Sequence, residues 1–184
     1  MRSLSIRRGV AALHGGGVIA CPTEAVWGLS CDPFDEAAVS RLLNLKRRDP
    51  GKGLILVAAA ESQLEWLLQG LPVAQRARLR LSWPGPTTWL IPHHGRVPSW
   101  IHGDHDTVAV RVSAHRVVSA LCHSWQGAMV STSANPAGSQ AAVHAFQVRR
   151  YFGERLDDIV PGAVSGARRP TVIKHLESDQ IVRA

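Results

Sequence analysis

The chain has 184 residues, of which 45% are hydrophobic and 19% are charged, a balance that excludes a disordered chain and suits a globular domain. No apolar run approaches the roughly 20 residues that span a bilayer, and the basic N-terminus lacks the features of a signal peptide. The formal net charge of +7 favours polyanionic partners such as nucleotides or RNA. We therefore expect one cytoplasmic domain over residues 1–184, without membrane contact.

Hydrophobic spacing and turn residues predict helices and strands that alternate along the chain. Helices are expected within residues 4–14, 32–48, 61–69, 74–83, 115–125 and 144–152. Strands are expected at 18–21, 53–59, 87–92, 107–112, 128–133 and 171–175, and a surface loop at 160–170. Interleaved elements of this kind predict an α/β fold: a single-domain, twisted, open mixed sheet with flanking helices.

The cysteines indicate neither a disulfide framework nor a zinc site. Cys21, Cys31 and Cys122 are widely spaced and form no CxxC pair, which favours free thiols in a reducing compartment. The stretch "HGDHD" at 102–106 lacks regular ligand spacing, so an exposed turn is expected there and no metal held by protein side chains. The glycine-rich phosphate loops GxxxxGK[ST] and GxGxxG are also absent from the sequence.

The segment "CPTEAVWGLSCD" at 21–32 places polar residues directly after an apolar strand. Pro22 ends that strand because proline cannot donate to a sheet ladder. Thr23 and Glu24 then lie at a strand end, where ligands of open α/β sheets bind. The alternative is a plain strand–turn–strand with Trp27 in the core.

The segment "LKRRDPGKGL" at 45–54 carries Lys46, Arg48 and Lys52 at a helix C-terminus and in the following loop. Cations at a helix C-terminus complement its dipole whether or not they bind a ligand. Converging donors would also suit a triphosphate, since hydrogen bonds from charged groups are strong. Both interpretations stand on the local sequence.

Two further segments contain polar side chains in apolar surroundings. Arg111 in "AVRV" needs a carboxylate partner, either Glu24 or one from a ligand, because an unpaired buried charge is costly. "VSTSANPAG" at 130–138 places hydroxyls and an amide at a strand end, where they can bind phosphate, ribose or an amino group. The alternative is an ST-turn that shapes the loop.

Five segments occur in an order that resembles the YrdC-like family: "PTEAVWGL", "LKRRDPGKGLILVAA", "WPGPTTWL", "AVRV" and "VSTSANPAG". Within it, the chain is most similar to the short bacterial threonylcarbamoyl-AMP synthases. The resemblance implies a basic concave cavity and a nucleotidyltransferase that converts L-threonine, bicarbonate and ATP into L-threonylcarbamoyl-adenylate and pyrophosphate. Threonylcarbamoyl-transferase proteins would then modify tRNA at the adenosine beside the anticodon.

The resemblance also implies roles for individual residues. The family's KxR and SxN signatures match Lys46, Arg48, Ser133 and Asn135, which are implied to line the reaction cavity. Thr23 is implied to contact threonine.

Further roles follow from the same resemblance. Lys52 and Arg111 are implied to bind nucleotide phosphate or the threonine carboxylate, with Arg111 nearer the carboxylate. Ser131 and Thr132 fall at nucleotide contacts, and Thr171 corresponds to a hydroxyl near the phosphates. Mg²⁺ is expected to be held mainly by phosphates and water, because no Asp/Glu cluster is evident.

The sequence departs from the family pattern at several positions. Asp49, Ser30 and Ser113 stand where Pro, Gly and Pro are common, and Lys174 stands where an acidic residue often lies. Asp49 adds a negative charge near the expected phosphates. Glu24 is a candidate general base, or an anchor for Arg111 or Lys46.

Two alternative functions use the same fold. One is a non-catalytic protein that binds double-stranded RNA or tRNA through its basic concavity. The other is a paralogue with a different carbamoyl-type activity. The KxR and SxN residues favour the synthase, since simple RNA binding would not require them.

Overall fold

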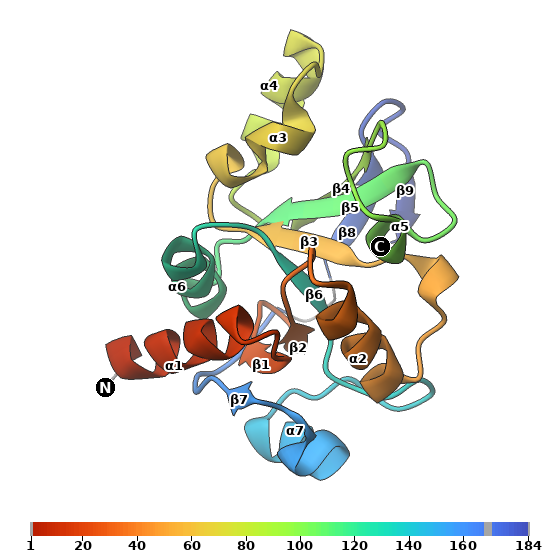
Figure 1. The fold of residues 1–184 in the computed structure, drawn as a ribbon. Helices are drawn as coiled ribbons and strands as arrows, with labels where there is room; N and C mark the ends of the chain where they lie inside the picture. The colour runs from red at the N-terminus through yellow and green to blue at the C-terminus, as the bar shows by residue number, and fades with distance from the viewer. Residues whose placement is uncertain (1, 168–170, 184) are drawn as a thin grey trace.

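The computed structural model describes residues 2–167 and 171–183, and its strands form one mixed sheet (Figure 1). The order across the nine strands is β7-β1-β2-β6-β3-β5-β4-β8-β9. Their bounds are β1 Ile19–Pro22, β2 Trp27–Ser30, β3 Ile55–Ala58, β4 Thr87–Pro92, β5 Thr107–Val112, β6 Met129–Ser133, β7 Asp158–Ile159, β8 Val172–His175 and β9 Ile181–Arg183. The pairs β1–β7, β3–β5 and β4–β8 are parallel, and the other neighbours are antiparallel. The predicted mixed sheet is confirmed.

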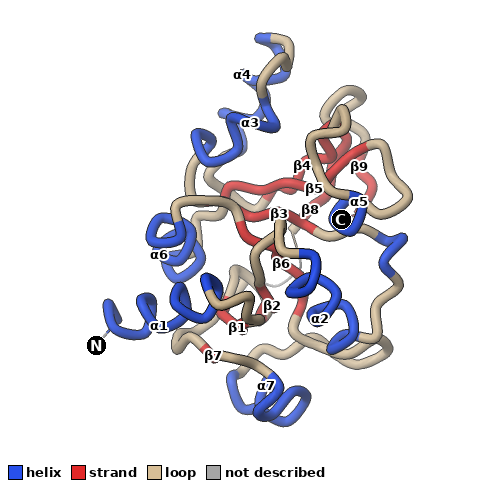
Figure 2. The backbone as a smooth tube through the Cα atoms, viewed as in Figure 1, coloured by secondary structure: helices blue, strands red, loops and turns tan. Residues whose placement is uncertain are grey.

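The helices lie against this sheet and over its ends (Figure 2). Their bounds are α1 Arg2–His14, α2 Glu36–Lys46, α3 Glu65–Leu68, α4 Val73–Ser82, α5 Ser99–His102, α6 Arg116–Trp125 and α7 Ala145–Phe152. Short 3₁₀ turns cover Pro50–Lys52, Glu61–Leu64 and Gly153–Arg155. The single helix expected at 61–69 is therefore a 3₁₀ turn followed by α3.

Both faces of the sheet are buried, because successive strand residues enter different apolar clusters. On β3, Val57 packs in the cluster that includes Val10 of α1 and Leu121 of α6. Its neighbour Leu56 packs in the larger cluster that includes Leu42 of α2. This double burial explains the continuous apolar runs that predicted β3 and β6.

The start of α2 and its end are both fixed locally. Asp35 is the N-cap, and its side chain accepts a hydrogen bond from the Ala38 amide at 3.0 Å. Arg47 takes a left-handed conformation at φ 51° and caps the helix, whose last residue, Lys46, lies two residues before the predicted end. The chain turns there, which sends Lys46 and Arg48 in different directions.

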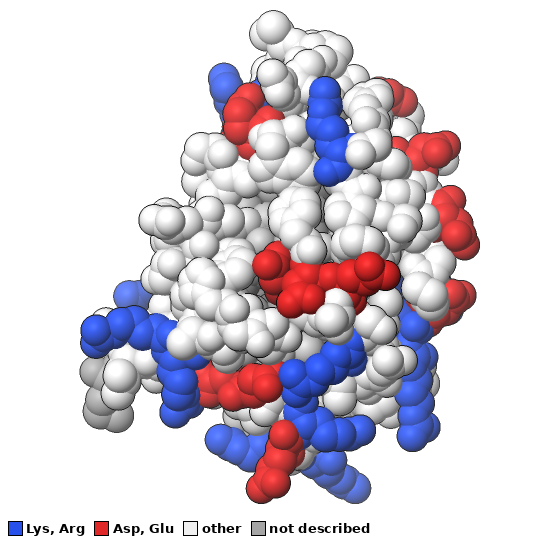
Figure 3. Space-filling model, viewed as in Figure 1, with Lys and Arg blue, Asp and Glu red and all other residues white. Residues whose placement is uncertain are grey.

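Charge is distributed unevenly over the surface (Figure 3). In this view Lys and Arg gather along the lower edge, over the region that Figure 1 assigns to α1, α2 and α7. Acidic side chains lie across the middle and along the right side. Two adjacent basic residues of the sequence, Arg168 and Arg169, lie outside the described residues. Within the described chain, no helix is long and apolar enough to cross a membrane.

Candidate active site

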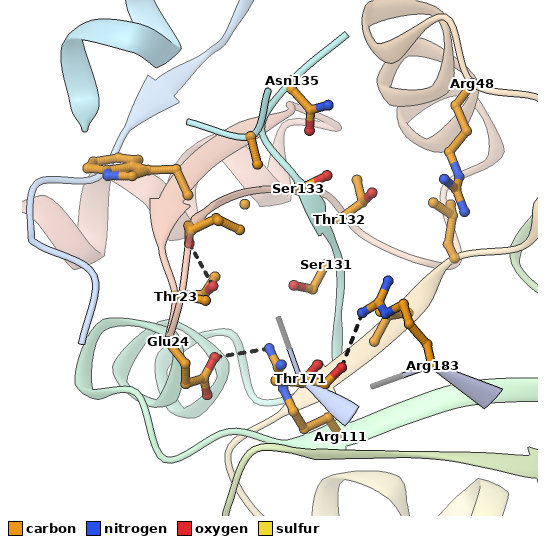
Figure 4. Close-up of a pocket in the computed structure, with 17 residues that line it drawn as sticks. Thr23, Glu24, Arg48, Arg111, Ser131, Thr132, Ser133, Asn135, Thr171 and Arg183 are labelled. Carbon is orange, nitrogen blue, oxygen red and sulfur yellow. Dashed lines mark hydrogen bonds and ion pairs between the residues drawn. The ribbon is translucent and has the colours of Figure 1, made fainter. Parts of the chain in front are cut away.

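A cavity of about 270 Å³ lies beside the turn that joins β1 to β2 (Figure 4). Its walls come from that turn, the start of β3, the end of β6, β5, β9 and the residue before β8. The predicted site residues on the wall are Thr23, Arg48, Arg111, Ser131, Thr132, Ser133, Asn135 and Thr171. Lys46 and Lys52 are the two predicted residues that do not line it.

The β1–β2 hairpin brings Thr23 to the cavity. Pro22 lies opposite Trp27 in the antiparallel pair, and Trp27 is 1% exposed in the core. Both the amide and the hydroxyl of Thr23 bond to the Val26 carbonyl, at 3.0 and 2.7 Å. The strand–turn–strand alternative is thus confirmed, and its turn also forms a cavity wall.

Lys46 lies behind the wall formed by the segment after β6. Its ammonium donates to the main-chain carbonyls of Ser133 and Asn135, the latter at 3.0 Å. The residue is buried, and burial together with nearby Arg48 lowers its pKa to about 8. In this structure Lys46 holds the wall of the cavity from behind.

Arg48 reaches the cavity from the loop after α2. Its Nη2 donates to the Gly53 carbonyl at 2.9 Å, and its buried Nε has no partner among described residues. Burial lowers the pKa of Arg48, an effect that Asp49 opposes. The Asp49 carboxylate accepts from the Gly51 amide at 3.0 Å and caps the 3₁₀ turn. Asp49 therefore shapes the loop and does not line the cavity.

Lys52 is exposed and lines a second cavity of about 210 Å³. This cavity shares Arg48, Leu54, Ile55 and Arg183 with the first. Arg48 and Lys52, which flank the Pro-Gly turn, therefore do not converge in one cavity: Arg48 lines both cavities and Lys52 lines only the second. A ligand long enough to pass Arg48 could meet both Arg48 and Lys52.

Arg111 forms the floor of the cavity with Glu24. Its Nη2 lies 3.2 Å from Glu24 Oε2, and both side chains are buried. Burial lowers the pKa of Arg111, and the Glu24 charge opposes this. The buried Nε of Arg111 has no hydrogen-bond partner in the described chain. Glu24 therefore supplies the internal carboxylate, and Arg111 contributes a positive charge to the cavity wall.

The hydroxyl segment belongs to β6, where Ser133 pairs with Gly28 and Ser131 pairs with Ile55. The hydroxyls of Ser131, Thr132 and Ser133 make no hydrogen bond to other described residues. Asn135 Nδ2 donates to Pro136 and Ser139 carbonyls at 3.1 and 2.7 Å, so the amide does shape the loop. Its buried Oδ1 has no partner among the described residues.

Sequence reasoning missed Arg183, which lines both cavities from β9. Its Nη2 donates to the Thr171 carbonyl at 3.3 Å, and the Thr171 hydroxyl lies 3.2 Å from that of Thr88. Figure 4 shows Arg48, Arg111 and Arg183 around one space. The only sequence signal was a cation after two apolar residues near the chain end. Glu24 is the one described carboxylate on this wall, so the cavity attracts anions.

The sequence matches the profile of the Sua5/yciO/yrdC family, described as "Telomere recombination", over residues 11–184. The chain belongs to this family. A threonylcarbamoyl-AMP synthase of Stutzerimonas stutzeri (strain A1501) is 53% identical over 171 residues, covering 93% of this chain and 92% of that relative. One from Halorhodospira halophila (strain DSM 244 / SL1) is 50% identical over 182 residues, covering 99% and 95%.

Solved Sua5/YciO/YrdC structures have the same fold. P. abyssi Sua5 complexed with L-threonine superposes with a TM-score of 0.86 at 31% identity. The match covers 92% of this chain and 50% of that one, so this chain spans about half its length. E. coli YciO, at 24% identity and a TM-score of 0.84, supports the fold alone. The motif resemblance and the α/β fold it implied are confirmed.

Proposed function

We propose that this chain makes L-threonylcarbamoyl-adenylate from L-threonine, bicarbonate and ATP, with release of pyrophosphate. Relatives at 53% and 50% identity carry the name threonylcarbamoyl-AMP synthase. The observation that carries the proposal for this chain is the charge of the cavity. Arg48, Arg111 and Arg183 line it, and the one carboxylate among its described residues, Glu24, is paired with Arg111. That excess suits an amino-acid carboxylate and a polyphosphate together.

The threonine end of the site is assigned to Arg111 and Thr23. The guanidinium of Arg111 lines the cavity and can pair with a carboxylate, and Thr23 lies on the same wall. A relative of the same fold, P. abyssi Sua5, was solved in complex with L-threonine. Glu24 already contacts Arg111 and Ser113, which favours its role as an anchor over that of a general base.

The nucleotide end is assigned to Arg48, Lys52 and Arg183, together with the β6 hydroxyls. Free hydroxyls of Ser131, Thr132 and Ser133 can donate to phosphate or accept from ribose. Asn135 Oδ1 can accept from the substrate, and Thr171 can contribute a hydroxyl near Arg183. Lys46 then contributes by holding the carbonyls of this wall in place.

The reaction proceeds by two bond-forming steps. The threonine nitrogen attacks the carbon derived from bicarbonate, and loss of water gives a carbamate. A carbamate oxygen then attacks the α-phosphorus of ATP, and the bond to the bridging oxygen breaks as pyrophosphate leaves. Nucleotidyl transfer of this kind depends on positioning and on charge stabilisation, which the arginine-lined cavity supplies.

Magnesium enters this proposal only as part of the MgATP substrate. Described residues contain no group of three His, Cys, Asp or Glu side chains arranged to hold a metal ion. Glu24, the carboxylate on the described cavity wall, is already paired with Arg111. The side chains therefore do not fit a resident Mg²⁺ site, and no step is routed through one. Phosphates and water are common ligands for this ion.

The product would pass to threonylcarbamoyl-transferase proteins that modify tRNA in the cytoplasm. The basic lower edge in Figure 3 supports a polyanionic partner such as tRNA. The affinity of this protein for tRNA should fall steeply as the salt concentration rises if the contacts are made to tRNA phosphates.

The experiment measures pyrophosphate release by purified protein given ATP, L-threonine and bicarbonate. We expect release only when all three are present, with the adenylate found by mass spectrometry. Arg48→Ala should lose most activity, whereas Lys174→Ala, a cation outside both cavities, should not. Absence of threonine-dependent pyrophosphate release would refute the proposed synthase activity. Salt-dependent RNA binding without adenylate formation would instead support the RNA-binding alternative.

A further inference from the structure

Ser113, directly after β5, forms a buried hydrogen bond beneath the cavity. Its hydroxyl donates to Glu24 Oε1 at 2.5 Å, and the residue is 1% exposed. We propose that Ser113 is a positioning residue for substrate: it fixes the Glu24 carboxylate, which in turn holds the Arg111 guanidinium in place at the cavity wall. The inference rests on the proposed function, in which Arg111 receives the threonine carboxylate.

The Glu24 carboxylate depends on this hydroxyl. Its Oε2 lies 3.2 Å from Arg111 Nη2, yet that oxygen accepts no aligned hydrogen bond from any described residue. Ser113 therefore provides the hydrogen bond that the described chain makes to this carboxylate. An ion pair alone tolerates many orientations, whereas an added hydrogen bond to one oxygen narrows the orientations open to the group.

The direction of the Ser113 hydroxyl is itself determined. Its oxygen accepts from the His115 amide at 3.1 Å, and an amide can only donate. The hydroxyl proton is then available to Glu24, which is the acceptor. The Ser113 amide bonds to the Ala58 carbonyl at 2.9 Å, which ties the residue to the end of β3.

His115 anchors the other end of the network. The Val117 amide donates to its Nδ1 at 3.3 Å, so that nitrogen carries no proton. The Nε2 atom lies 3.1 Å from the Ala163 carbonyl and must be the donor. Because the Val117 amide can only donate and the Ala163 carbonyl can only accept, the hydrogen bonds of the ring are compatible with one neutral tautomer. Ser113 is therefore held by β3 and by the first turn of α6.

Arg111 is the member that faces the substrate. It lines the cavity at 5% exposure, and its Nε is buried without a partner among described residues. Its Nη2 pairs with Glu24, which fixes the position of the guanidinium at the cavity wall. Rotation of Glu24 would move the guanidinium and displace the charge that meets the threonine carboxylate. A displaced Ser113 hydroxyl therefore affects threonine through two intervening groups.

The test compares Ser113→Ala with Ser113→Thr and Ser113→Val, a pair of nearly equal size that differ in the hydroxyl. Ser30→Ala is the control for loss of a buried serine, because Ser30 is also 1% exposed and its hydroxyl contacts Cys21 rather than Glu24. Pyrophosphate release gives KM for each substrate, calorimetry gives L-threonine affinity directly, and thermal unfolding reports stability.

We expect Ser113→Ala and Ser113→Val to raise KM for L-threonine roughly tenfold or more, the size expected for one hydrogen bond to a charged group. KM for ATP should stay close to wild type, and Ser113→Thr should retain threonine affinity. If Ser113→Ala does not fold, the Thr and Val pair gives the same comparison.

Equal threonine affinity in the Thr and Val variants would overturn the positioning role. So would equal changes in both KM values with a lower unfolding temperature, which indicate a purely structural residue. Failure of the proposed function is distinguishable from these, because wild type itself would then show no threonine-dependent pyrophosphate release.

Discussion

The ammonium of Lys46 donates to the main-chain carbonyl of Asn135 at 3.0 Å, across 89 positions of sequence. The same ammonium bonds to the Ser133 carbonyl, and the Ala137 amide donates back to the Lys46 carbonyl at 2.7 Å. The end of α2 and the loop after β6 are thus joined as one unit. The lysine of the KxR signature and the residues of the SxN signature support each other structurally.

Lys46→Met should disrupt this unit while keeping the length and bulk of the side chain. Two carbonyls lose a charged donor, while the buried charge is removed, so we expect a net destabilisation of about 2 kcal/mol. Activity should fall at least tenfold as the Ser133–Asn135 wall shifts. Chemical denaturation and pyrophosphate release measure the two effects. Lys174→Met is the control. A Lys46→Met protein with wild-type activity and stability would show that Lys46 does not hold the two segments together.

The Lys46 ammonium should titrate near pH 8. Burial and Arg48 lower its pKa to about 8 from an ordinary value of 10.5. Between those values the unfolded chain binds more protons than the folded chain. The Lys46 contribution to the free energy of unfolding therefore rises with pH across about 8 to 10.5, and is lost as pH falls through 8.

NMR of lysine Nζ groups measures this titration, with Lys46→Arg to assign the signal. Lys174, which is partly exposed, serves as the comparison within the same spectrum. Denaturation at several pH values should show that the free energy of unfolding of the wild type rises between about pH 8 and 10.5. This rise should be absent in Lys46→Met. A Lys46 signal that titrates at the ordinary value of 10.5 would show that the ammonium is not desolvated.

Strand pairing explains why so much of the site was predictable. Thr23, Arg111 and Ser131 each lie in or directly after a strand that its apolar residues identify. β2 separates β1 from β6, and β5 and β6 run in opposite directions on the two sides of β3, so the order and register of the sheet bring these residues to one cavity. The family motifs then assigned roles that the spacing alone left open.

Other features could not be predicted because they depend on contacts remote in sequence. The direction of Lys46 is set by the left-handed turn at Arg47 and by carbonyls beyond β6. β7 and β9 have two and three residues, too few for any hydrophobic period. Arg183 lies on one of these strands, so its place in the cavity followed only from pairing with β8.

Arg111→Lys should weaken L-threonine binding while leaving ATP binding close to wild type. Lysine keeps the positive charge beside Glu24 but lacks the planar fork that matches a carboxylate. We expect KM for L-threonine to rise roughly tenfold or more, since a bidentate contact becomes a single one. Arg78→Lys is a matched control, because Arg78 is part-buried, donates to the Leu176 carbonyl and lines neither cavity. An unchanged KM for threonine would remove Arg111 from the threonine end.

Arg183→Ala should weaken the binding of ATP more than the binding of L-threonine. Arg183 lines both cavities beside Arg48. Burial is the main cause that lowers the pKa of Arg48 and of Arg111, and the charge of Arg183 lowers both further. Removing it takes one positive charge from the nucleotide end and leaves the Glu24–Arg111 pair intact. We expect KM for ATP to rise roughly tenfold, as for loss of one charge-assisted hydrogen bond. Lys174→Ala on the adjacent strand β8 is the control. A larger rise in KM for L-threonine than for ATP would instead indicate that the ATP phosphates bind away from β9.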